Sequence, residues 1–200
     1  MAIIVDKIQK RKDIALSCKQ ILIEEGINKI SISKLAKFAG ISKGSFYDYF
    51  TNKNDLVFEI INLSILKHNI LKEEKLNSVK SSREKVKIFL EIFYEEEDDE
   101  LRNLYKEFLS ISLSEPTKDI IDYHTRHNEE YYLWFKSIFD EGIEKKELKP
   151  EARKLVNGLF LLGTGVFISQ LTCKVKTNSK KEIDNYVDTI FDLIEINKCN

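Results

Sequence analysis

The spacing of apolar residues along most of the chain is that of helices. In residues 6–25, apolar side chains recur at intervals of three or four positions, with charged residues between them. Gly26 follows this stretch, where a left-handed glycine commonly ends a helix. The chain has only 7 Gly and 2 Pro, too few for the turns that a sheet protein needs roughly every 8–12 residues. The sequence therefore predicts an all-α protein.

Capping residues divide the next part of the chain into shorter helices. Ser31 is the predicted N-cap of a second helix, which Gly40 ends. Ser42 then begins a third helix that reaches about Phe50. Asn52 is the predicted cap of a longer fourth helix, because an acceptor at the cap is followed by an acid in the first turn.

The remaining chain continues the helical pattern without an internal repeat. The acidic run of residues 95–100 interrupts it and is predicted to be a solvated loop or a frayed helix end. About nine helices result in total. The later ones are expected at residues 83–94, 101–113, 118–142, 155–173 and 182–196.

Residues 155–173 carry no charge, which is typical of a membrane span or of a helix buried by protein. Their length approaches the ~20 residues of a membrane span. They nevertheless include three glycines and several polar side chains, among them Asn157, Ser169 and Gln170. We therefore expect a helix buried by protein, within the chain or against a second subunit, and no membrane association.

The composition is that of a globular protein, with 42% hydrophobic and 32% charged residues in 200. Three cysteines, Cys18, Cys173 and Cys199, form neither a disulfide framework nor a zinc pattern. The apolar N-terminal stretch is too short for a signal peptide. These features predict a cytoplasmic location.

The net charge of −1 is unevenly distributed along the chain. Residues 1–53 contain ten Lys or Arg against five Asp or Glu, a net charge of +5. The remainder contains 22 basic and 28 acidic residues, a net charge of −6. A positive N-terminal part, here called the head, indicates binding to a polyanion.

Residues 31–53 have the length and chemistry of a helix-turn-helix, two short helices joined by a glycine-containing turn. The helical period places Phe46 and Phe50 on the inner face of the second helix. Its outer face then carries Gly44, Ser45, Tyr47 and Asp48, with Lys43 on the flank, which suits close approach to a DNA major groove. Similar helix pairs also occur in proteins that never bind DNA.

The same segment resembles the N-terminal domain of the TetR/AcrR family of transcriptional regulators, strongly over residues 10–60. The resemblance implies a homodimeric repressor that binds a palindromic DNA operator, with a C-terminal domain that binds a small-molecule inducer and dimerises. The residues that carry it are Ala36, Ala39, Gly40, Ile41, Ser42, Lys43, Gly44, Ser45, Phe46, Tyr47, Tyr49, Phe50, Lys53 and Leu56.

The resemblance also implies which residues face DNA. Lys43, Ser45 and Tyr47 are expected in the groove, whereas Ser31, Tyr49 and Lys53 are expected at phosphates. Two positions depart from the family pattern: Ser33, where relatives often carry a basic residue, and the acidic Asp48. The full predicted set is Ser31, Ser33, Ser42, Lys43, Gly44, Ser45, Tyr47, Tyr49 and Lys53.

The uncharged helix and the last helix are predicted to form the surface between two subunits, because the family pairs them in an intersubunit four-helix bundle. A buried core helix of a monomer is the alternative. Three glycines within the uncharged helix indicate close packing, since each costs ~1 kcal/mol there. The predicted contact residues are Leu155, Leu159, Leu162, Val166, Phe167, Val187, Ile190, Phe191 and Ile194.

Aromatic residues of the middle helices are candidates for an inducer pocket, and they predict an apolar or aromatic ligand. Any one of them could equally belong to the core. His124 and His127 have a spacing that can bind a divalent metal, but surface histidines are the simpler interpretation, and no metal site is predicted. The pocket candidates are Phe89, Phe93, Tyr105, Phe108, Tyr123, Tyr131, Trp134 and Phe135.

The sequence thus predicts a ligand-responsive transcriptional regulator, acting as a repressor, with a DNA-binding domain in residues 1–53 and a ligand-binding and dimerisation domain in 54–200. Ligand would shift the population of a dimer in which the fourth helix, about residues 53–71, moves the head. No catalytic residue and no cofactor are predicted, because the phosphate loops and nucleophile motifs of enzymes are missing from the sequence. The alternative is a helical protein–protein interaction module with a basic head.

Overall fold

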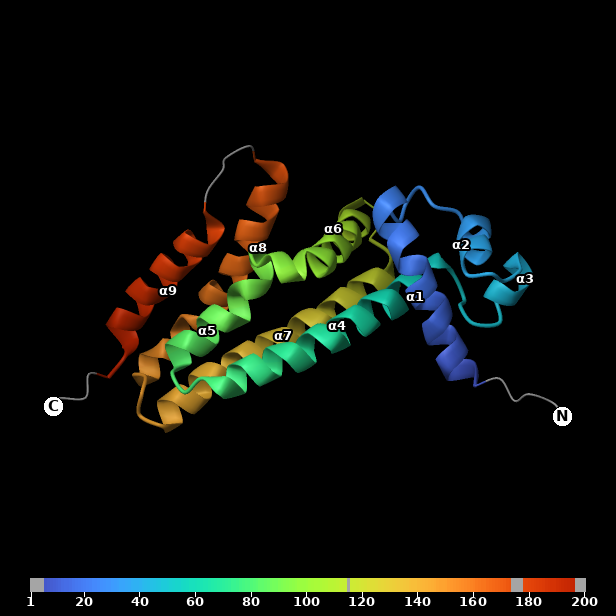
Figure 1. Ribbon diagram of the computed structural model, residues 1–200. Coiled ribbons are helices and arrows are strands. Elements are labelled where there is room, and N and C mark those ends of the chain that lie inside the picture. The colour runs from blue at the N-terminus through green and yellow to red at the C-terminus, as the bar shows by residue number, and fades with distance from the viewer. Residues whose placement is uncertain (1–5, 115, 174–177, 197–200) are drawn as a thin grey trace. The chain divides into compact units, whose positions relative to one another are not determined.

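The computed structural model describes residues 6–114, 116–173 and 178–196, and these ranges are helical nearly throughout (Figure 1). Within them no strand forms, and Leu148 pairs with Glu195 in an isolated bridge. The all-α prediction is confirmed for this part of the chain. The helices are α1 (Lys7–Glu25), α2 (Ile32–Phe38), α3 (Lys43–Phe46), α4 (Lys53–Ser78), α5 (Ser82–Leu90), α6 (Asp99–Ser114), α7 (Lys118–Glu144), α8 (Val156–Thr172) and α9 (Ser179–Ile194), with 3-10 turns η1 (Glu91–Phe93), η2 (Glu96–Asp98) and η3 (Pro150–Lys154).

The chain divides into two compact units. Residues 1–69 and 100–124 form unit 1, and residues 70–99 and 125–200 form unit 2. Unit 1 therefore extends beyond the head and includes the first part of α4, most of α6 and the start of α7. A functional boundary at residue 53 stays a prediction, because the compact units do not divide the chain there.

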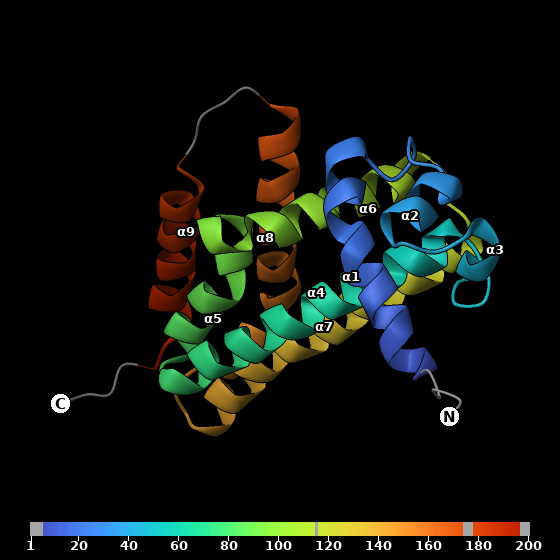
Figure 2. The same cartoon turned by 45° about the vertical axis from the view of Figure 1, so that its right-hand side comes forward.

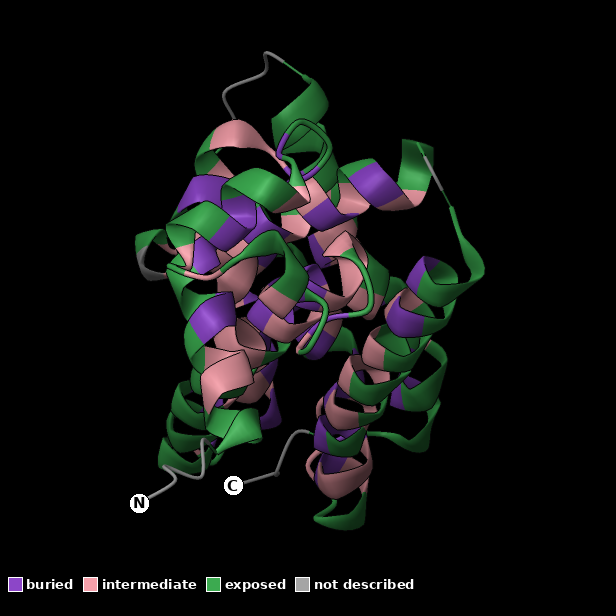
Figure 3. Cartoon of the chain, turned by 90° about the vertical axis from the view of Figure 1, so that its right-hand side faces the viewer, coloured by how far each residue is buried: buried purple, intermediate pink, exposed green. Residues whose placement is uncertain are grey.

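The helix caps predicted for unit 1 are present, and Asp6 is a further cap that was not predicted. Asp6 accepts from the backbone N–H groups of Ile8 and Gln9, and Gly26 ends α1 with a φ of 82°. The Asn52 side chain accepts from the Asp55 N–H at 2.9 Å and so caps α4. Figure 3 shows how buried and exposed positions alternate along the helices, as the apolar spacing requires.

Three helix lengths differ clearly from the predictions. Helix α5 ends at Leu90 instead of residue 94, because the chain tightens there into the 3-10 turn η1. Helix α3 ends at Phe46 instead of Phe50, because the N–H groups of Asp48 and Tyr49 bond three residues back and tighten the chain into a turn. Helix α4 continues to Ser78, beyond the expected end near Leu71, since Leu76 extends its buried face.

Unit 2 has its own core, to which α5, α7, α8 and α9 contribute. Helices α8 and α9 lie side by side in both views (Figures 1 and 2). The acidic run of residues 95–100 contains η2 and the start of α6, and Glu95 pairs with Lys180 at 2.8 Å. Among the described residues, no helix combines the length and apolar character that a membrane crossing requires.

The two cysteines in the described ranges do not form a disulfide with each other. Cys18 is buried in unit 1 and Cys173 is exposed at the end of α8, both as free thiols. Cys199 lies outside the described residues.

Lys72 of α4 is a charged side chain inside unit 2, with 4% of its surface exposed. Its ammonium donates to the Phe89 carbonyl oxygen at 2.8 Å and lies 4.7 Å from the centre of the Phe89 ring. Burial lowers the pKa of Lys72 to about 8, and the charges of Asp98 and Glu91 offset only part of this effect. The unfolded lysine titrates near 10.4, so unfolding takes up a proton between about pH 8 and pH 10.4.

The Lys72→Met substitution should remove a pH dependence of stability. Because the pKa of Lys72 is lower in the folded protein, the free energy of unfolding rises with pH through that window. Below pH 8 the cost of burying the charged Lys72 ammonium is fully present. Relative to the variant, the wild-type free energy of unfolding should rise by roughly 3 kcal/mol between pH 8 and pH 10.5 in urea titrations. Lys67→Met, at an exposed lysine of the same helix, is the control and should keep the wild-type dependence. Parallel wild-type and Lys72→Met curves would contradict the prediction.

Candidate nucleic-acid interface

The turn between α2 and α3 needs a glycine for its positive φ angle and not for lack of room for a side chain. Gly40 has a φ of 67°, and a Cβ added there would meet no atom within 4 Å. The helices on either side begin at side-chain caps. The Ser31 hydroxyl accepts from the Lys34 N–H at 3.3 Å, and the Ser42 hydroxyl accepts from the Ser45 N–H at 3.0 Å. Local chemistry thus defines both short helices at the predicted places.

Helix α3 and the turn after it have one buried and one exposed side. Phe46 and Phe50 are 0% and 1% exposed, with ring centres 5.3 Å apart, as the helical period predicts. Tyr47 is 51% exposed and meets the Phe46 ring edge-on at 5.6 Å. The phenylalanines therefore fix the segment in the core, and the Tyr47 ring stands on the outside.

The remaining outer positions of the segment are small or polar. Lys43 and Gly44 are exposed, and Ser45 is half-buried. The Ser42 and Ser45 hydroxyl oxygens lie 2.9 Å apart. Asp48 is also exposed, so the face combines one cation and one acid with neutral hydroxyl groups.

Gly44 is not required by the fold of the chain. A Cβ added to Gly44 would meet only the Ser42 hydroxyl, at an ordinary contact distance of 3.6 Å, and its φ is not positive. A glycine inside a helix costs about 0.5–1 kcal/mol relative to alanine. The packing and backbone conformation of the folded chain therefore give no reason for a glycine at this exposed position.

An arginine that sequence reasoning missed stabilises the turn after α3. Arg11 of α1 donates to the Tyr49 carbonyl oxygen, pairs with Asp55 at 2.7 Å and Glu59 at 2.9 Å, and lies 4.4 Å from the Phe50 ring centre. Partial burial favours a higher pKa for Asp55, but hydrogen bonds from Arg11 and Thr51 outweigh it and lower that pKa. The spacing of Asp55 and Glu59, one helical turn apart, was the available signal for a cation partner.

Lys53, a predicted phosphate contact, has partners inside the protein. Its ammonium donates to the carbonyl oxygens of Ile27 at 2.7 Å and Ile30 at 3.3 Å. These carbonyls belong to the loop between α1 and α2. A contact with phosphate stays a prediction for Lys53, as it does for the exposed Ser31 and the half-buried Tyr49.

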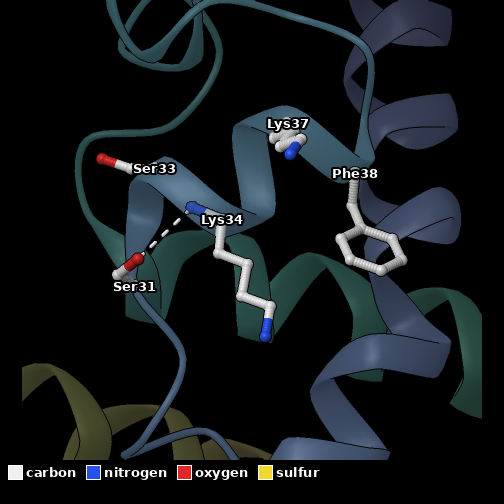
Figure 4. A pocket seen from close by; sticks show the side chains of 5 residues that line it. All are labelled: Ser31, Ser33, Lys34, Lys37 and Phe38. Atoms are coloured by element: carbon white, nitrogen blue, oxygen red, sulfur yellow. Dashed lines mark hydrogen bonds between the residues drawn. The ribbon is translucent and has the colours of Figure 1, made fainter.

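An open hollow on the surface of unit 1 lies along α2 (Figure 4). Two predicted DNA-facing residues, Ser31 and Ser33, line it at the N-terminal end of the helix. Lys34, Lys37 and the 55% exposed Phe38 complete the lining and were not predicted. Lys34 also pairs with Glu25. Lys37 is the other cation of the lining, and it is exposed.

The eight aromatic residues predicted for a pocket are divided between the units. In unit 1, Phe58 stacks on Tyr123 with ring centres 4.2 Å apart. In unit 2, the Phe89 ring meets Trp134 edge-on at 5.4 Å. Phe89, Phe108, Tyr123 and Phe135 are buried core residues. The unit 1 residues are Tyr105, Phe108 and Tyr123, and the unit 2 residues are Phe89, Phe93, Tyr131, Trp134 and Phe135; a ligand role for them stays a prediction.

The predicted subunit contact stays a prediction, although several of its residues are buried within their own chain. Four of them, on the inner faces of α8 and α9, belong to the core of unit 2. Phe167 is also buried and lies beside the Phe93 ring, with ring centres 6.4 Å apart. The four core residues are Leu159, Val187, Phe191 and Ile194; Leu155, Leu162, Val166 and Ile190 are partly buried.

The exposed faces of α8 and α9 carry other apolar side chains. Leu161 and Ile168 on α8 are 51% and 44% exposed, and Tyr186 and Leu193 on α9 are 48% and 65% exposed. Of the three α8 glycines, only Gly163 packs within the chain, since a Cβ there would overlap the Phe93 ring. Positions 158 and 165, the other two, have nothing within 4 Å of an added Cβ.

The histidines do not take part in a recognisable metal site. The His124 ring meets the Phe108 ring edge-on, with ring centres 5.3 Å apart. In the part of the chain that the structure describes, no group of three or more His, Cys, Asp or Glu side chains could bind a metal ion.

Comparison with known proteins identifies relatives of the N-terminal segment. Residues 19–60 match the model described as "Bacterial regulatory proteins, tetR family". An HTH-type transcriptional regulator of Staphylococcus aureus is 38% identical over 56 residues, which are 28% of this chain and 30% of that protein. The HTH-type transcriptional repressor BepR of Brucella suis is 32% identical over 53 residues, 26% of this chain and 25% of its own length. The match thus spans less than a third of either relative.

Solved structures extend the likeness in fold to nearly the whole chain. A TetR-family transcriptional regulator from Cytophaga hutchinsonii superposes with a TM-score of 0.79, covering 98% of this chain and 99% of that one at 16% identity. The all-α fold with an N-terminal helix-turn-helix is therefore confirmed, and so is the resemblance to the TetR family that the sequence motif predicts.

Two glycine substitutions should separate a fold requirement from a surface one. Gly40→Ala should lower the free energy of unfolding by about 1 kcal/mol, because alanine is strained at a positive φ. Gly44→Ala should leave it unchanged or raise it by up to about 1 kcal/mol, because the helix gains propensity without a clash. Urea unfolding of both variants measures the difference, and a clear loss of stability in Gly44→Ala would show that the fold itself needs this glycine.

Proposed function

We propose that this chain, whose N-terminal segment is of the TetR type, is a transcriptional regulator that binds duplex DNA in a sequence-specific way through the exposed face of α3. The observation that carries the proposal is Gly44. The fold has room for a side chain there, yet the chain keeps a glycine beside the exposed Tyr47. A close approach by another molecule explains both features.

The chemistry of this face suits a major groove. Lys43 supplies a cation, and Ser45 and Tyr47 supply hydroxyl groups that donate and accept hydrogen bonds to base edges. Exposed Ser31, Ser33 and Ser42 are suited to phosphate oxygens. The positive charge of the head favours DNA and also an acidic partner protein, so a protein-binding head is the competing function that the salt dependence below tests.

The proposed assembly is a homodimer on a palindromic operator. Leu161 and Ile168 of α8 give an uncharged, exposed apolar face, and the open positions of Gly158 and Gly165 lie two helical turns apart on it. Glycines without a neighbour in their own chain suit the close approach of a helix from a second copy. Two heads can then enter successive major grooves about 34–36 Å apart.

We further propose that the regulator is a repressor that a small apolar or aromatic inducer releases. The name of the BepR relative supports repression. The concentration of Phe89, Tyr131 and Trp134 in unit 2 supports a ligand in that unit. Helix α4 continues from unit 1 into unit 2, so the unit that is proposed to bind the ligand is connected to the head through a continuous helix. As a DNA-bound regulator the protein would act in the cytoplasm.

Substitutions on the exposed face of α3 should abolish sequence preference without changing stability. A duplex selected from a random pool serves as the operator, and fluorescence anisotropy measures affinity. Lys43→Ala and Tyr47→Ala should each weaken binding roughly 5- to 150-fold, the range of 1–3 kcal/mol for a good base contact. Tyr47→Phe should reproduce the loss if the hydroxyl makes the contact, and Gly44→Ala should weaken binding because the new methyl group blocks close approach.

Lys118→Ala, at an exposed lysine of α7 in unit 1, is the charge control and should bind as the wild type does. For the wild type, log K should fall by about 0.9 per neutralised phosphate for each unit of log salt, and one palindrome should be preferred over random duplex by ~10³ or more. Retained preference in Lys43→Ala and Tyr47→Ala would show that α3 does not read the sequence. Failure of the selection to yield any preferred duplex would favour the protein-binding alternative.

Charges on the exposed face of α8 should dissociate the dimer. Leu161→Glu and Ile168→Glu place carboxylates where the second copy is proposed to pack, and burying unpaired charges is costly. Sedimentation should show dimers for the wild type and monomers for the variants. Leu133→Glu on α7, where the wild-type leucine is 61% exposed, is the matched control and should remain dimeric. A monomeric wild type, or dimeric α8 variants, would contradict the proposal.

A further inference from the structure

The backbone of Ile27, just after α1, has a side-chain partner from a distant part of the sequence. Glu107 of α6 accepts the Ile27 N–H at 3.0 Å. Ile27 is 1% exposed, and the backbone hydrogen bonds of this loop are made by Gly26, Lys29 and Ile30. A buried N–H requires an acceptor, and at Ile27 the Glu107 carboxylate fulfils that requirement.

Gly26 makes room for this carboxylate. A Cβ added to Gly26 would lie 3.1 Å from the Glu107 Oε2 atom, which is closer than most side-chain contacts. The φ of 82° at Gly26 is also one that L residues rarely adopt. The sequence at the end of α1 is therefore matched both to the turn and to the group that contacts it.

The same loop is contacted from a second helix by a group of opposite charge. The Lys53 ammonium donates to the Ile27 carbonyl oxygen at 2.7 Å and to the Ile30 carbonyl oxygen at 3.3 Å. Ile27 thus bonds to α6 through its N–H and to the first residue of α4 through its carbonyl. Both polar groups of one buried residue are held by side chains that lie outside the loop.

An ion pair also joins α6 to α1. Glu100 pairs with Lys19 at 2.8 Å. Glu100 and Glu107 are seven residues apart, two turns of the helix, so they share one face of α6. Between them Leu104 is 1% exposed and packs in the same core as α1. A shift of α6 along its axis would therefore disturb an ion pair, a buried leucine and the Ile27 contact together.

The loop that Glu107 contacts leads directly into the proposed DNA-binding helices. Ile30 precedes Ser31, the N-cap of α2, and α2 packs on α3. We infer that Glu107 is a positioning residue for DNA binding: through the Ile27 N–H, α6 sets the place of the α1–α2 loop and hence of α2 and α3. This inference rests on the proposed function.

The decisive variants are Glu107→Ala, which removes the acceptor, and Glu107→Gln, which keeps a carbonyl oxygen of the same reach without the charge. Asn62→Ala is the stability control, because it removes the hydrogen bond from the Tyr123 hydroxyl to Asn62 in the same unit without touching the loop. Affinity for the selected duplex is measured well below the melting temperature of every variant. Glu107→Ala should bind roughly tenfold more weakly, equivalent to about 1.4 kcal/mol. Glu107→Gln and Asn62→Ala should bind within roughly twofold of the wild type.

Amide hydrogen exchange gives a readout that does not need DNA. Glu107→Ala should speed exchange at Ile27 and also at the capped N–H groups of Lys34 in α2 and Ser45 in α3, and Glu107→Gln should restore protection. Faster exchange at Ile27 alone, or wild-type DNA affinity in Glu107→Ala, would overturn the inference. If the wild type binds no DNA, the proposed function fails, and the exchange at Lys34 and Ser45 still decides whether Glu107 positions these helices.

Discussion

A helix of four residues has no stability of its own, and the surface that is proposed to face DNA is built on such a helix. Isolated helices shorter than ~12–15 residues are marginal in water. Helix α3 therefore depends on the burial of Phe46 and Phe50, whose rings contact each other inside the core of unit 1. Arg11 adds to this by contacting the Phe50 ring and the Tyr49 carbonyl oxygen. The exposed face is displayed only because the opposite face is packed.

The glycines of the chain fall into two groups with different physical roles. Gly26 and Gly40 provide positive φ angles at the ends of helices, and Gly163 leaves space for the Phe93 ring. Gly44, Gly158 and Gly165 have no such reason within the chain. The second group lies on the two surfaces for which partners are proposed, DNA and a second copy. Unused space at a glycine is therefore informative about binding.

Several of the positively charged side chains of the head make contacts within the chain. Arg11 and Lys19 pair with carboxylates of α4 and α6, and Lys53 contacts backbone carbonyl oxygens. Lys43 and Lys37 remain on the exposed surface. The net charge counted from the sequence thus overstates the charge that is presented to a polyanion. The ionic contacts of α1 and its loop instead connect the head to α6, and this connection gives α6 its proposed influence on DNA binding.

The sequence by itself determined the helical class, the helix-turn-helix and the sides of α3, because apolar period, caps and glycine turns are local properties. Ser31, Ser42 and Asn52 cap the helices that they were expected to begin. Local pattern could not decide which of two apolar faces a helix turns inward. Val187 and Phe191, for example, are expected at a subunit contact from their spacing and belong to the core of unit 2 in the structure.

Only the tertiary structure decided the partners of charged side chains. The contacts from Arg11 to Asp55 and from Glu107 to Ile27 join residues 44 and 80 positions apart. No periodicity relates such residues, because their proximity results from the packing of α1, α4 and α6 around one core. Local rules thus fixed the surface that is proposed to meet DNA, and long-range packing fixed what holds that surface in place.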